Sequence, residues 1–324
     1  MTKPHIDIAI IGAGVVGLAT ALSVKRKFPE FEIMVFEQSK YLGEGISGRN
    51  SQVIHSGIYY PQDSLKSRFC IEGNKKLYEF CAKYQVPFRK TGKLIVSTES
   101  STDSKIEWLY KNGIMLGLKD LRLLSPAEIF SIEPEIIGTL GLYIQSTGVI
   151  DVSAFLKKVS SIIQNNVQVL MNTKVIDIIP DNNQFLLCTS TRGNVSARYI
   201  INCAGLESDR IANILGSSIT MYPCKGDYFF IRNQKKHLVN RPIYPIPEAH
   251  GLGIHLTKML DDTILCGPDT YFIDSKDDYD LKEKHILEKQ ELFFQSIQRF
   301  FPKIEKSDLI PGYAGIRPKL KPKE

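Results

Sequence analysis

Three closely spaced glycines near the start of the chain have the spacing of a dinucleotide-binding turn. Gly12, Gly14 and Gly17 form a GxGxxG pattern between an apolar run, residues 6–11, and a helical pattern, residues 15–26. In such a turn the first glycine makes the bend, the second lets a pyrophosphate approach the backbone, and the third lets helix and strand pack closely. The helix N-terminus would add N–H groups and a partial positive charge, so we expect a nucleotide cofactor here.

An acidic residue follows this turn at the distance that ribose binding requires. Residues 33–36 predict a second buried strand, and Glu37 stands at its end. A carboxylate at this position can accept hydrogen bonds from ribose hydroxyls and would repel a 2′-phosphate, which disfavours NADP. The fingerprint alone does not separate FAD from NAD.

A second segment is more specific. Residues 47–60 read SGRNSQVIHSGIYY, and four further motifs follow: TGVID at 147–151, NCAGL at 202–206, PCKGDY at 223–228 and GIRPKL at 315–320. Together these motifs resemble the D-amino-acid-oxidase-like family of FAD-dependent oxidoreductases, and within it the L-2-hydroxyglutarate oxidase/dehydrogenase branch. The resemblance runs from Asp7 to Leu320 and is most specific over residues 50–60.

The resemblance implies FAD as the cofactor and assigns its contacts. The ADP half would bind at the three glycines and Glu37. The pyrophosphate and ribityl chain would lie along residues 47–51, with contacts from Ser47, Arg49, Asn50 and Ser51. Val175 would meet the adenine, while Ala204 and Gly205 would let backbone approach the cofactor. The substrate would lie over the flavin ring, beneath a β-rich domain.

Two histidines are candidates for the catalytic site. His55 stands in a glycine-flanked turn that the resemblance places beside the flavin ring. A neutral imidazole there could take the hydroxyl proton as hydride leaves the substrate carbon. A covalent bond to the flavin, as in some relatives, and a purely structural role remain alternatives. His255 would line the pocket from the β-rich side, or be a strand-end histidine with no functional task.

Cationic residues are candidates for holding an acidic substrate. Arg317, just before Pro318, could grip a carboxylate through paired hydrogen bonds, or could be a surface arginine beside the lysines that follow. Lys66, Arg68 and Lys93 are weaker candidates for a second carboxylate, and each is expected to be a surface charge.

These residues together predict an enzyme that oxidises a small 2-hydroxy acid with FAD. The resemblance implies L-2-hydroxyglutarate as substrate and 2-oxoglutarate as product, with hydride transfer to flavin N5 and electrons passing to oxygen or to a quinone-type acceptor. Two alternatives stay open. One is an amine or amino-acid oxidase of the same fold, and the other is a poorly active FAD-binding remnant.

The motifs require an α/β fold with a doubly wound, Rossmann-type sheet. Residues 167–170, 175–179, 185–189 and 199–205 predict further strands, and residues 151–165 predict a helix capped by Asp151 or Ser153. The region after Met221 is strand-rich. We therefore expect an FAD-binding domain built from residues 1–90, 148–216 and 306–324, interleaved with a β-rich substrate domain from residues 91–147 and 217–305.

Composition limits the other classes of function. The chain has 324 residues and a formal charge of +6, and its basic clusters lack interleaved aromatic residues, so we expect no nucleic-acid partner. The six cysteines form no CxxC pair, which argues against a zinc site or a disulfide framework and favours a reducing compartment. The apolar run over residues 8–22 is short and interrupted by glycines, unlike a membrane span or signal segment. We expect a cytoplasmic protein, with peripheral contact at the inner face of the membrane as a second option.

The end of the sequence departs from the resemblance. Relatives normally continue past the position of Leu320 with a glycine-rich turn and a helix whose N-terminus faces the flavin, whereas the sequence given stops at Glu324. From this departure we expect looser FAD binding and slower turnover than in a full-length relative.

Overall fold

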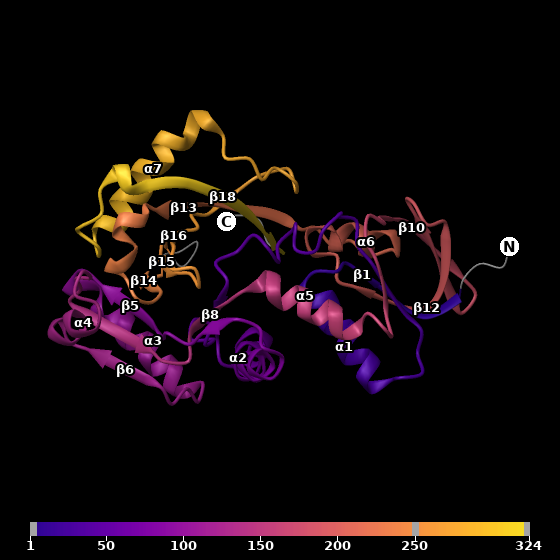
Figure 1. Cartoon of the computed structure of the whole chain (residues 1–324), viewed down its shortest axis with the longest axis horizontal. Helices are drawn as coiled ribbons and strands as arrows, with labels where there is room; N and C mark the ends of the chain where they lie inside the picture. The colour runs from indigo at the N-terminus through magenta and orange to yellow at the C-terminus, as the bar shows by residue number, and fades with distance from the viewer. Residues whose placement is uncertain (1–4, 248–252, 321–324) are drawn as a thin grey trace.

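The computed structural model describes residues 5–247 and 253–320 and shows an elongated molecule with a sheet toward each end (Figure 1). A six-stranded sheet with the N-terminal strand lies at one end, and a nine-stranded sheet lies at the other. Lys321 and Lys323, expected in a basic tail, lie outside the described residues.

The six-stranded sheet has a parallel centre. Its order is β10 (Val175–Asp181), β11 (Gln184–Thr189), β12 (Asn194–Asn202), β1 (His5–Ile11), β2 (Ile33–Phe36) and β9 (Gln168–Leu170). Strand β1 pairs in parallel with β12 and β2, and β2 pairs in parallel with β9. Strands β10, β11 and β12 form an antiparallel meander at the edge.

Apolar residues on both faces of β1 explain why the strand is buried. Ile8 and Ile10 belong to the core under helices α1 (Val15–Lys27) and α5 (Val152–Ile163). The alternate residues Ala9 and Ile11 belong to a second core that includes Ile211 of α6 (Ser208–Ile214). A continuous apolar run is what a parallel strand covered on both faces requires. The sheet covered by helices on both faces that the sequence predicts is therefore confirmed.

The nine-stranded sheet carries most of the remaining chain. Its order is β17 (Tyr271–Phe272), β13 (Tyr222–Ile231), β16 (Ile264–Cys266), β15 (Leu256–Lys258), β14 (Ile243–Pro245), β5 (Lys93–Ser97), β7 (Leu140–Ile144) and β6 (Leu121–Leu124), and β18 (Leu309–Lys319) pairs with β13 outside this path. Strands β14 and β5 are parallel, and the other pairs are antiparallel. Helix α7 (Glu283–Gln298) buries Phe293 and Ile297 in the largest core, beside β13 and β18.

Smaller elements connect the two sheets. A three-stranded sheet consists of β3 (Val53–Ile54), β8 (Gly148–Ile150) and β4 (Phe88–Arg89), and the remaining α-helices are α2 (Leu65–Tyr84), α3 (Asp103–Met115) and α4 (Pro126–Ile132). The described residues also form short 3₁₀ helices, η1 (Ser100–Thr102), η2 (Gly205–Glu207), η3 (Asn233–Leu238) and η4 (Lys306–Asp308). Figure 1 places β8 and α2 between the two large sheets.

Two expectations about strands need revision. Residues 306–324 were assigned to the FAD-binding domain, but β18 forms a long antiparallel pair with β13, from Tyr222↔Lys319 to Ile231↔Leu309, and so lies in the β-rich sheet. The strand expected over residues 199–205 ends at Asn202, and Tyr199 is 46% exposed rather than buried. The remaining domain boundaries stay a prediction.

Candidate active site

A groove of about 930 Å³ opens beside the N-terminus of α1, at the carboxyl ends of β1 and β2. Ligands of doubly wound sheets bind at this edge, and the volume is within the usual range for a cofactor pocket. Of the cofactor contacts expected from the sequence, the following line the groove: Gly12, Gly14, Glu37, Ser47, Arg49, Val175, Ala204 and Gly205. The other three are Gly17, Asn50 and Ser51.

The three glycines of the turn serve different purposes. A Cβ on Gly12 would lie 2.3 Å from the Cys203 carbonyl oxygen, and the φ of +105° also disfavours any other residue. A Cβ on Gly17 would lie 1.8 Å from the Gly12 carbonyl oxygen. Both glycines therefore let backbone segments pack. A Cβ on Gly14 would meet only the Ser47 hydroxyl, at 2.9 Å, so this glycine alone keeps space free on the groove side.

Glu37 is held rigidly at the rim of the groove. Its Oε2 accepts a hydrogen bond from the Ala13 N–H at 2.8 Å, and its Oε1 accepts one from the Ser39 N–H at 2.9 Å. Each carboxylate oxygen keeps a further lone pair for a ligand hydroxyl. Glu37 therefore joins the glycine turn to the end of β2 as well as offering acceptors to a ribose.

Residues 46–52 form a loop that closes the N-terminus of α1. The Ser47 hydroxyl accepts a hydrogen bond from the Val15 N–H at 2.9 Å. The Asn50 amide donates to the carbonyls of Ile46 at 3.0 Å and Ser47 at 2.8 Å, and its oxygen accepts from the Gln52 N–H at 2.8 Å. Asn50 therefore shapes the loop, while Ser47 occupies the place where a helix N-terminus receives an anion.

The same loop reaches the β-rich sheet. The Ser51 hydroxyl lies 3.3 Å from the Tyr228 hydroxyl. The Arg49 guanidinium lies 4.4 Å from the ring centroid of Tyr279, and its Nε donates to the Glu44 carbonyl at 3.0 Å. The loop thus positions residues on both the groove and the second sheet.

The groove fits FAD. Gly14 leaves room for a pyrophosphate beside backbone N–H groups, helix α1 begins without a side-chain cap of its own, and Glu37 offers ribose acceptors at the far rim. Sequence reasoning missed Arg210, which lines the groove and donates from Nη2 to the Val175 carbonyl at 2.9 Å. Arg210 lies outside every motif, so only the packing of α6 against β10 brings it here.

The second part of the site is a cluster of aromatic rings at the boundary of the β-rich sheet. The rings of Tyr244 and His255 are stacked with centroids 3.9 Å apart, and the His55 ring meets Tyr244 edge-on at 6.5 Å. Burial, then Lys93 and His255, lower the pKa of His55 to about 3. Burial chiefly lowers the pKa of His255 to about 3 as well. Both imidazoles are therefore neutral near pH 7.

Lys93 is not the surface charge that the sequence suggested. The residue is 0% exposed, and its Nζ lies 3.3 Å from the Tyr59 hydroxyl and over the rings of Tyr59 and Tyr244, at 4.3 Å and 4.6 Å from their centroids. Burial lowers the pKa of Lys93 to about 7. Lys66 and Arg68 do lie on the surface of α2, as expected.

Arg317 is half-buried in β18, opposite Cys224 of β13. Its Nη2 donates to the Thr270 hydroxyl at 2.8 Å and to the Asp269 carbonyl at 3.4 Å. Arg317 also helps to lower the pKa of His255, which places this guanidinium and the histidine in the same part of the site.

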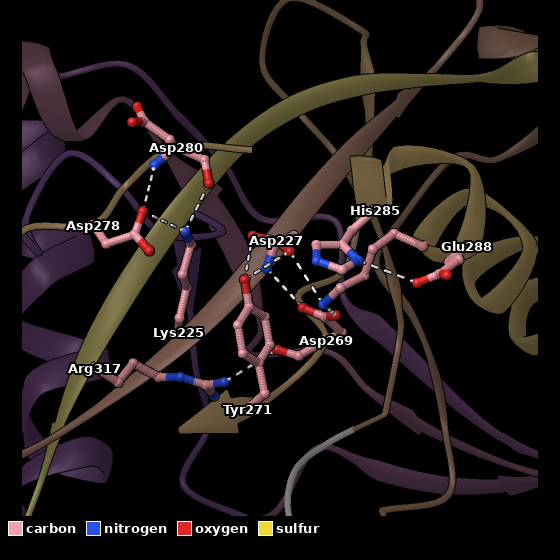
Figure 2. Close-up of polar contacts among 10 residues, drawn as sticks. Lys225, Asp227, Asp269, Tyr271, Asp278, Asp280, His285, Glu288 and Arg317 are labelled. Atoms are coloured by element: carbon pink, nitrogen blue, oxygen red, sulfur yellow. Dashed lines mark hydrogen bonds and ion pairs between the residues drawn. The ribbon is translucent and has the colours of Figure 1, made fainter. Parts of the chain in front are cut away.

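The segment that Arg317 contacts is held by a network of charged side chains, as Figure 2 shows. Lys289 of α7 bridges the carboxylates of Asp227, at 3.1 Å, and Asp269. The Tyr271 hydroxyl donates to Asp227 at 3.0 Å, and the Asp227 N–H donates to Asp269 at 2.7 Å. The network therefore fixes the turn whose Asp269 carbonyl and Thr270 hydroxyl receive Arg317.

Lys225, which lies on β13 like Asp227, forms a separate ion pair beside this network. Its buried ammonium donates to Asp278 at 3.2 Å and to the Asp280 carbonyl at 2.7 Å (Figure 2). This contact anchors the segment that carries Tyr279 to the groove edge.

Several buried polar atoms in the ring cluster lack a hydrogen-bond partner among the described residues. The Tyr244 hydroxyl, the His255 Nε2 and the Thr257 hydroxyl are such atoms. Buried polar groups are normally paired, so unpaired ones mark a place where a ligand or water is expected. An anionic hydroxy acid bound here would offset the two cations and so raise the pKa of the neutral imidazoles toward the range in which they accept a proton.

Two further observations concern the described residues. None of the helices within 5–247 and 253–320 is long and apolar enough to span a membrane. In the same residues, no three His, Cys, Asp or Glu side chains come together as a metal site.

The chain is similar in sequence to proteins that oxidise a hydroxy acid. It is 30% identical to L-2-hydroxyglutarate dehydrogenase of Indibacter alkaliphilus, over 96% of this chain and 86% of that protein. It is 32% identical to the mitochondrial L-2-hydroxyglutarate dehydrogenase of Arabidopsis thaliana, over 99% of this chain and 74% of that protein.

Solved structures and a family model agree with this similarity. L-alpha-glycerophosphate oxidase of Mycoplasma pneumoniae, solved with FAD bound, superposes with a TM-score of 0.89 at 26% identity, covering 97% of this chain and 83% of that one. Glycine oxidase of Geobacillus kaustophilus shares the fold, with a TM-score of 0.84 at 17% identity over 99% of this chain and 84% of that one. The model of the FAD dependent oxidoreductase family DAO matches residues 7–324. The chain belongs to this family of FAD-dependent oxidoreductases.

Proposed function

We propose that this chain oxidises L-2-hydroxyglutarate to 2-oxoglutarate with FAD held in the groove beside α1. The observation that carries the proposal is a cluster in which the His55 ring meets Tyr244 edge-on at 6.5 Å, Tyr244 stacks on His255 at 3.9 Å, and the Lys93 ammonium lies 4.6 Å from the Tyr244 ring centroid. Arg317, whose charge acts on His255, is the second cation. A hydroxy dicarboxylate needs one proton acceptor and two positive charges. The similarity to L-2-hydroxyglutarate dehydrogenases supports the choice of this acid.

FAD, when bound, accepts the hydride that leaves the carbon bearing the hydroxyl. His55 takes the hydroxyl proton, because its imidazole is uncharged and lies only four residues beyond Ser51 of the loop over residues 46–52, the cofactor loop. Arg317 holds a carboxylate through the N–H groups that Thr270 and Asp269 leave free. His255 presents its unpaired Nε2 toward the substrate and helps to orient the hydroxyl.

The cofactor contacts are also part of the proposal. Gly14, Glu37 and Ser47 receive the ADP half, Val175 meets the adenine, and Ala204 and Gly205 approach the cofactor with backbone. Arg49 covers the groove edge through its contact with Tyr279, whereas Gly17, Asn50 and Ser51 act by shaping the turn and the loop.

Anaerobic spectroscopy of the purified, FAD-loaded chain tests the proposal. We expect L-2-hydroxyglutarate to bleach the flavin absorbance, while the D-enantiomer and glycine leave it unchanged. Reoxidation by oxygen, compared with reoxidation by a quinone, then identifies the electron acceptor. A flavin that amino acids reduce and L-2-hydroxyglutarate does not would replace this proposal with an amino-acid oxidase.

A further inference from the structure

Lys93 is a buried cation without an acidic partner among the described residues. Its neighbours are the hydroxyl of Tyr59 and the faces of two phenol rings, and no carboxylate of the described chain pairs with it. Burying an ammonium group without a counter-charge is costly, because aromatic faces and one hydroxyl replace only part of its hydration. Such a group is retained where an anionic ligand completes it.

The position of Lys93 points to a ligand in the ring cluster. Lys93 acts electrostatically on both His55 and His255, and Arg317 acts on His255. The geometry agrees for Lys93, because its ammonium lies 4.6 Å from the Tyr244 ring centroid and that ring stacks on His255 at 3.9 Å. The Tyr244 ring lies under the Lys93 ammonium, and its hydroxyl and the His255 Nε2 are buried without partners. His55 and Tyr59 are half-buried, whereas Lys93, Tyr244 and His255 are buried.

We propose that Lys93 binds the second carboxylate of the substrate, the one that Arg317 does not hold, and thereby selects 2-hydroxy dicarboxylates over 2-hydroxy monocarboxylates. This inference rests on the proposed function, since it presumes that Arg317 and His55 receive the hydroxy-acid end. A lysine suits this role because its compact ammonium needs less space in a buried position than a planar guanidinium does.

Ligand binding then takes up a proton. Without ligand the pKa of Lys93 lies near 7 because of burial, and a bound carboxylate raises it. At pH 8 the ligand-free amine is mostly neutral, so binding a dicarboxylate should capture roughly one proton. The other titratable groups that face Lys93 do not gain or lose a proton near this pH. His55 and His255 stay neutral, and burial raises the pKa values of Tyr59, Tyr244 and Cys70.

Binding calorimetry on the FAD-loaded chain tests the inference without turnover. The probes are 2-oxoglutarate and 2-oxopentanoate, which share a chain length and differ in the second carboxylate. Titrations at pH 8 in two buffers of different ionisation enthalpy give the proton count. We expect uptake of roughly one proton with 2-oxoglutarate and none with 2-oxopentanoate.

The variant Lys93→Met keeps the volume and removes the charge. We expect it to bind 2-oxoglutarate about 100-fold more weakly, to lose the proton uptake, and to keep its affinity for 2-oxopentanoate. The matched control is Lys66→Met, which removes an exposed lysine from α2 and should change neither affinity. Equal losses for both probes, or no proton uptake by the unaltered chain, would overturn the inference.

A second variant covers the case in which Lys93→Met does not fold. Tyr59→Phe removes the hydrogen bond to the Lys93 ammonium and leaves the ring in place. We expect it to weaken 2-oxoglutarate several-fold and to leave 2-oxopentanoate unchanged, and unchanged affinity for both would count against Lys93. Failure of the proposed function is seen separately, as flavin that L-2-hydroxyglutarate does not reduce.

Discussion

The charge state of His55 follows from its surroundings. Burial removes hydration from the imidazolium, and Lys93 and His255 add repulsion, so that its pKa falls to about 3. At any pH between about 5 and 8 the ring is therefore neutral, and its readiness to accept a proton does not change across this range.

Replacing His55 should slow the chemical step. For His55→Ala we expect anaerobic flavin reduction by L-2-hydroxyglutarate to fall roughly a hundredfold, the usual scale of a general base, with little change in substrate affinity. Stopped-flow absorbance measures both quantities. His237→Ala, at an exposed position of η3, serves as the control. If only FAD retention suffers in His55→Ala, the histidine is structural.

Lys93 links ligand binding to stability. Its pKa is lowered from 10.5 to about 7 in the folded chain, so between these pH values the unfolded chain binds more protons than the folded one. Stability therefore rises with pH across this window, and the destabilisation is fully present below pH 7.

Removing this amine should change the pH dependence of unfolding. Relative to Lys93→Met, we expect the free energy of unfolding of the unaltered chain to rise by about 1 kcal/mol per pH unit from pH 7 to 9. Urea unfolding of both FAD-loaded proteins at a series of pH values measures the difference. Parallel curves would show that Lys93 keeps its proton when buried, contrary to its low pKa.

Sequence reasoning named His55, His255 and Arg317 as candidates, which stay predictions, and wrongly expected Lys93 to be a surface charge. A histidine or arginine inside a recognisable motif can be named as a candidate site residue from the motif alone. Lys93 begins a strand that is buried at all five positions, so no alternation of polar and apolar residues marks the side its ammonium takes. Its partners Tyr59 and Tyr244 come from distant segments, and only the folded chain brings them together.

At the scale of elements, the glycine turn separates folding from cofactor binding. Gly12 and Gly17 allow close contact between backbone segments, whereas Gly14 faces the groove and a Cβ there would meet only Ser47. The pattern GxGxxG predicted this division of roles, because the turn, the strand and the helix are contiguous in sequence.

Two substitutions in the turn should therefore fail differently. Gly14→Val should leave the protein folded but colourless, because the new side chain fills the space of the pyrophosphate. Gly17→Ala should lower the unfolding temperature, since its Cβ would lie 1.8 Å from the Gly12 carbonyl oxygen. Circular dichroism and flavin absorbance distinguish the two effects. A Gly14→Val protein that is yellow and fully loaded with FAD would show that the groove is not the FAD site.

The pairing of β18 shows what element-level reasoning missed. The strand lies about ninety residues beyond its partner β13, with much of the β-rich sheet between them in sequence. A motif at the chain's end therefore named Arg317 as a candidate but did not predict the sheet that holds it. Placement in β18 explains why a network on α7 and β13, rather than the FAD-binding sheet, orients its guanidinium.

At the scale of the whole molecule, the cofactor loop is the joint between the two sheets. The Tyr313 hydroxyl of β18 donates to the Asn50 carbonyl at 2.7 Å, and the Ser51 hydroxyl lies near Tyr228 of β13. A Cβ on Gly315 would lie 2.3 Å from the Arg49 carbonyl oxygen, so β18 passes directly against the loop that closes the groove. The loop beside the groove is thus joined to the β-rich sheet by two side-chain contacts and one close backbone contact.

A methyl group at this contact should disturb both halves of the site together. In Gly315→Ala either the loop or β18 must move, at a cost of about 1–3 kcal/mol. Moving the loop shifts Ser47 from the N-terminus of α1, and moving β18 shifts Arg317, which stands two residues along the strand. We therefore expect weaker FAD retention, a lower unfolding temperature and a higher Michaelis constant for L-2-hydroxyglutarate in the same variant.

Gly73→Ala in α2 is the matched control, because nothing lies within 4 Å of its Cβ position and alanine favours helix by up to about 1 kcal/mol. If Gly315→Ala keeps its flavin and its Michaelis constant, the two sheets do not communicate through this loop.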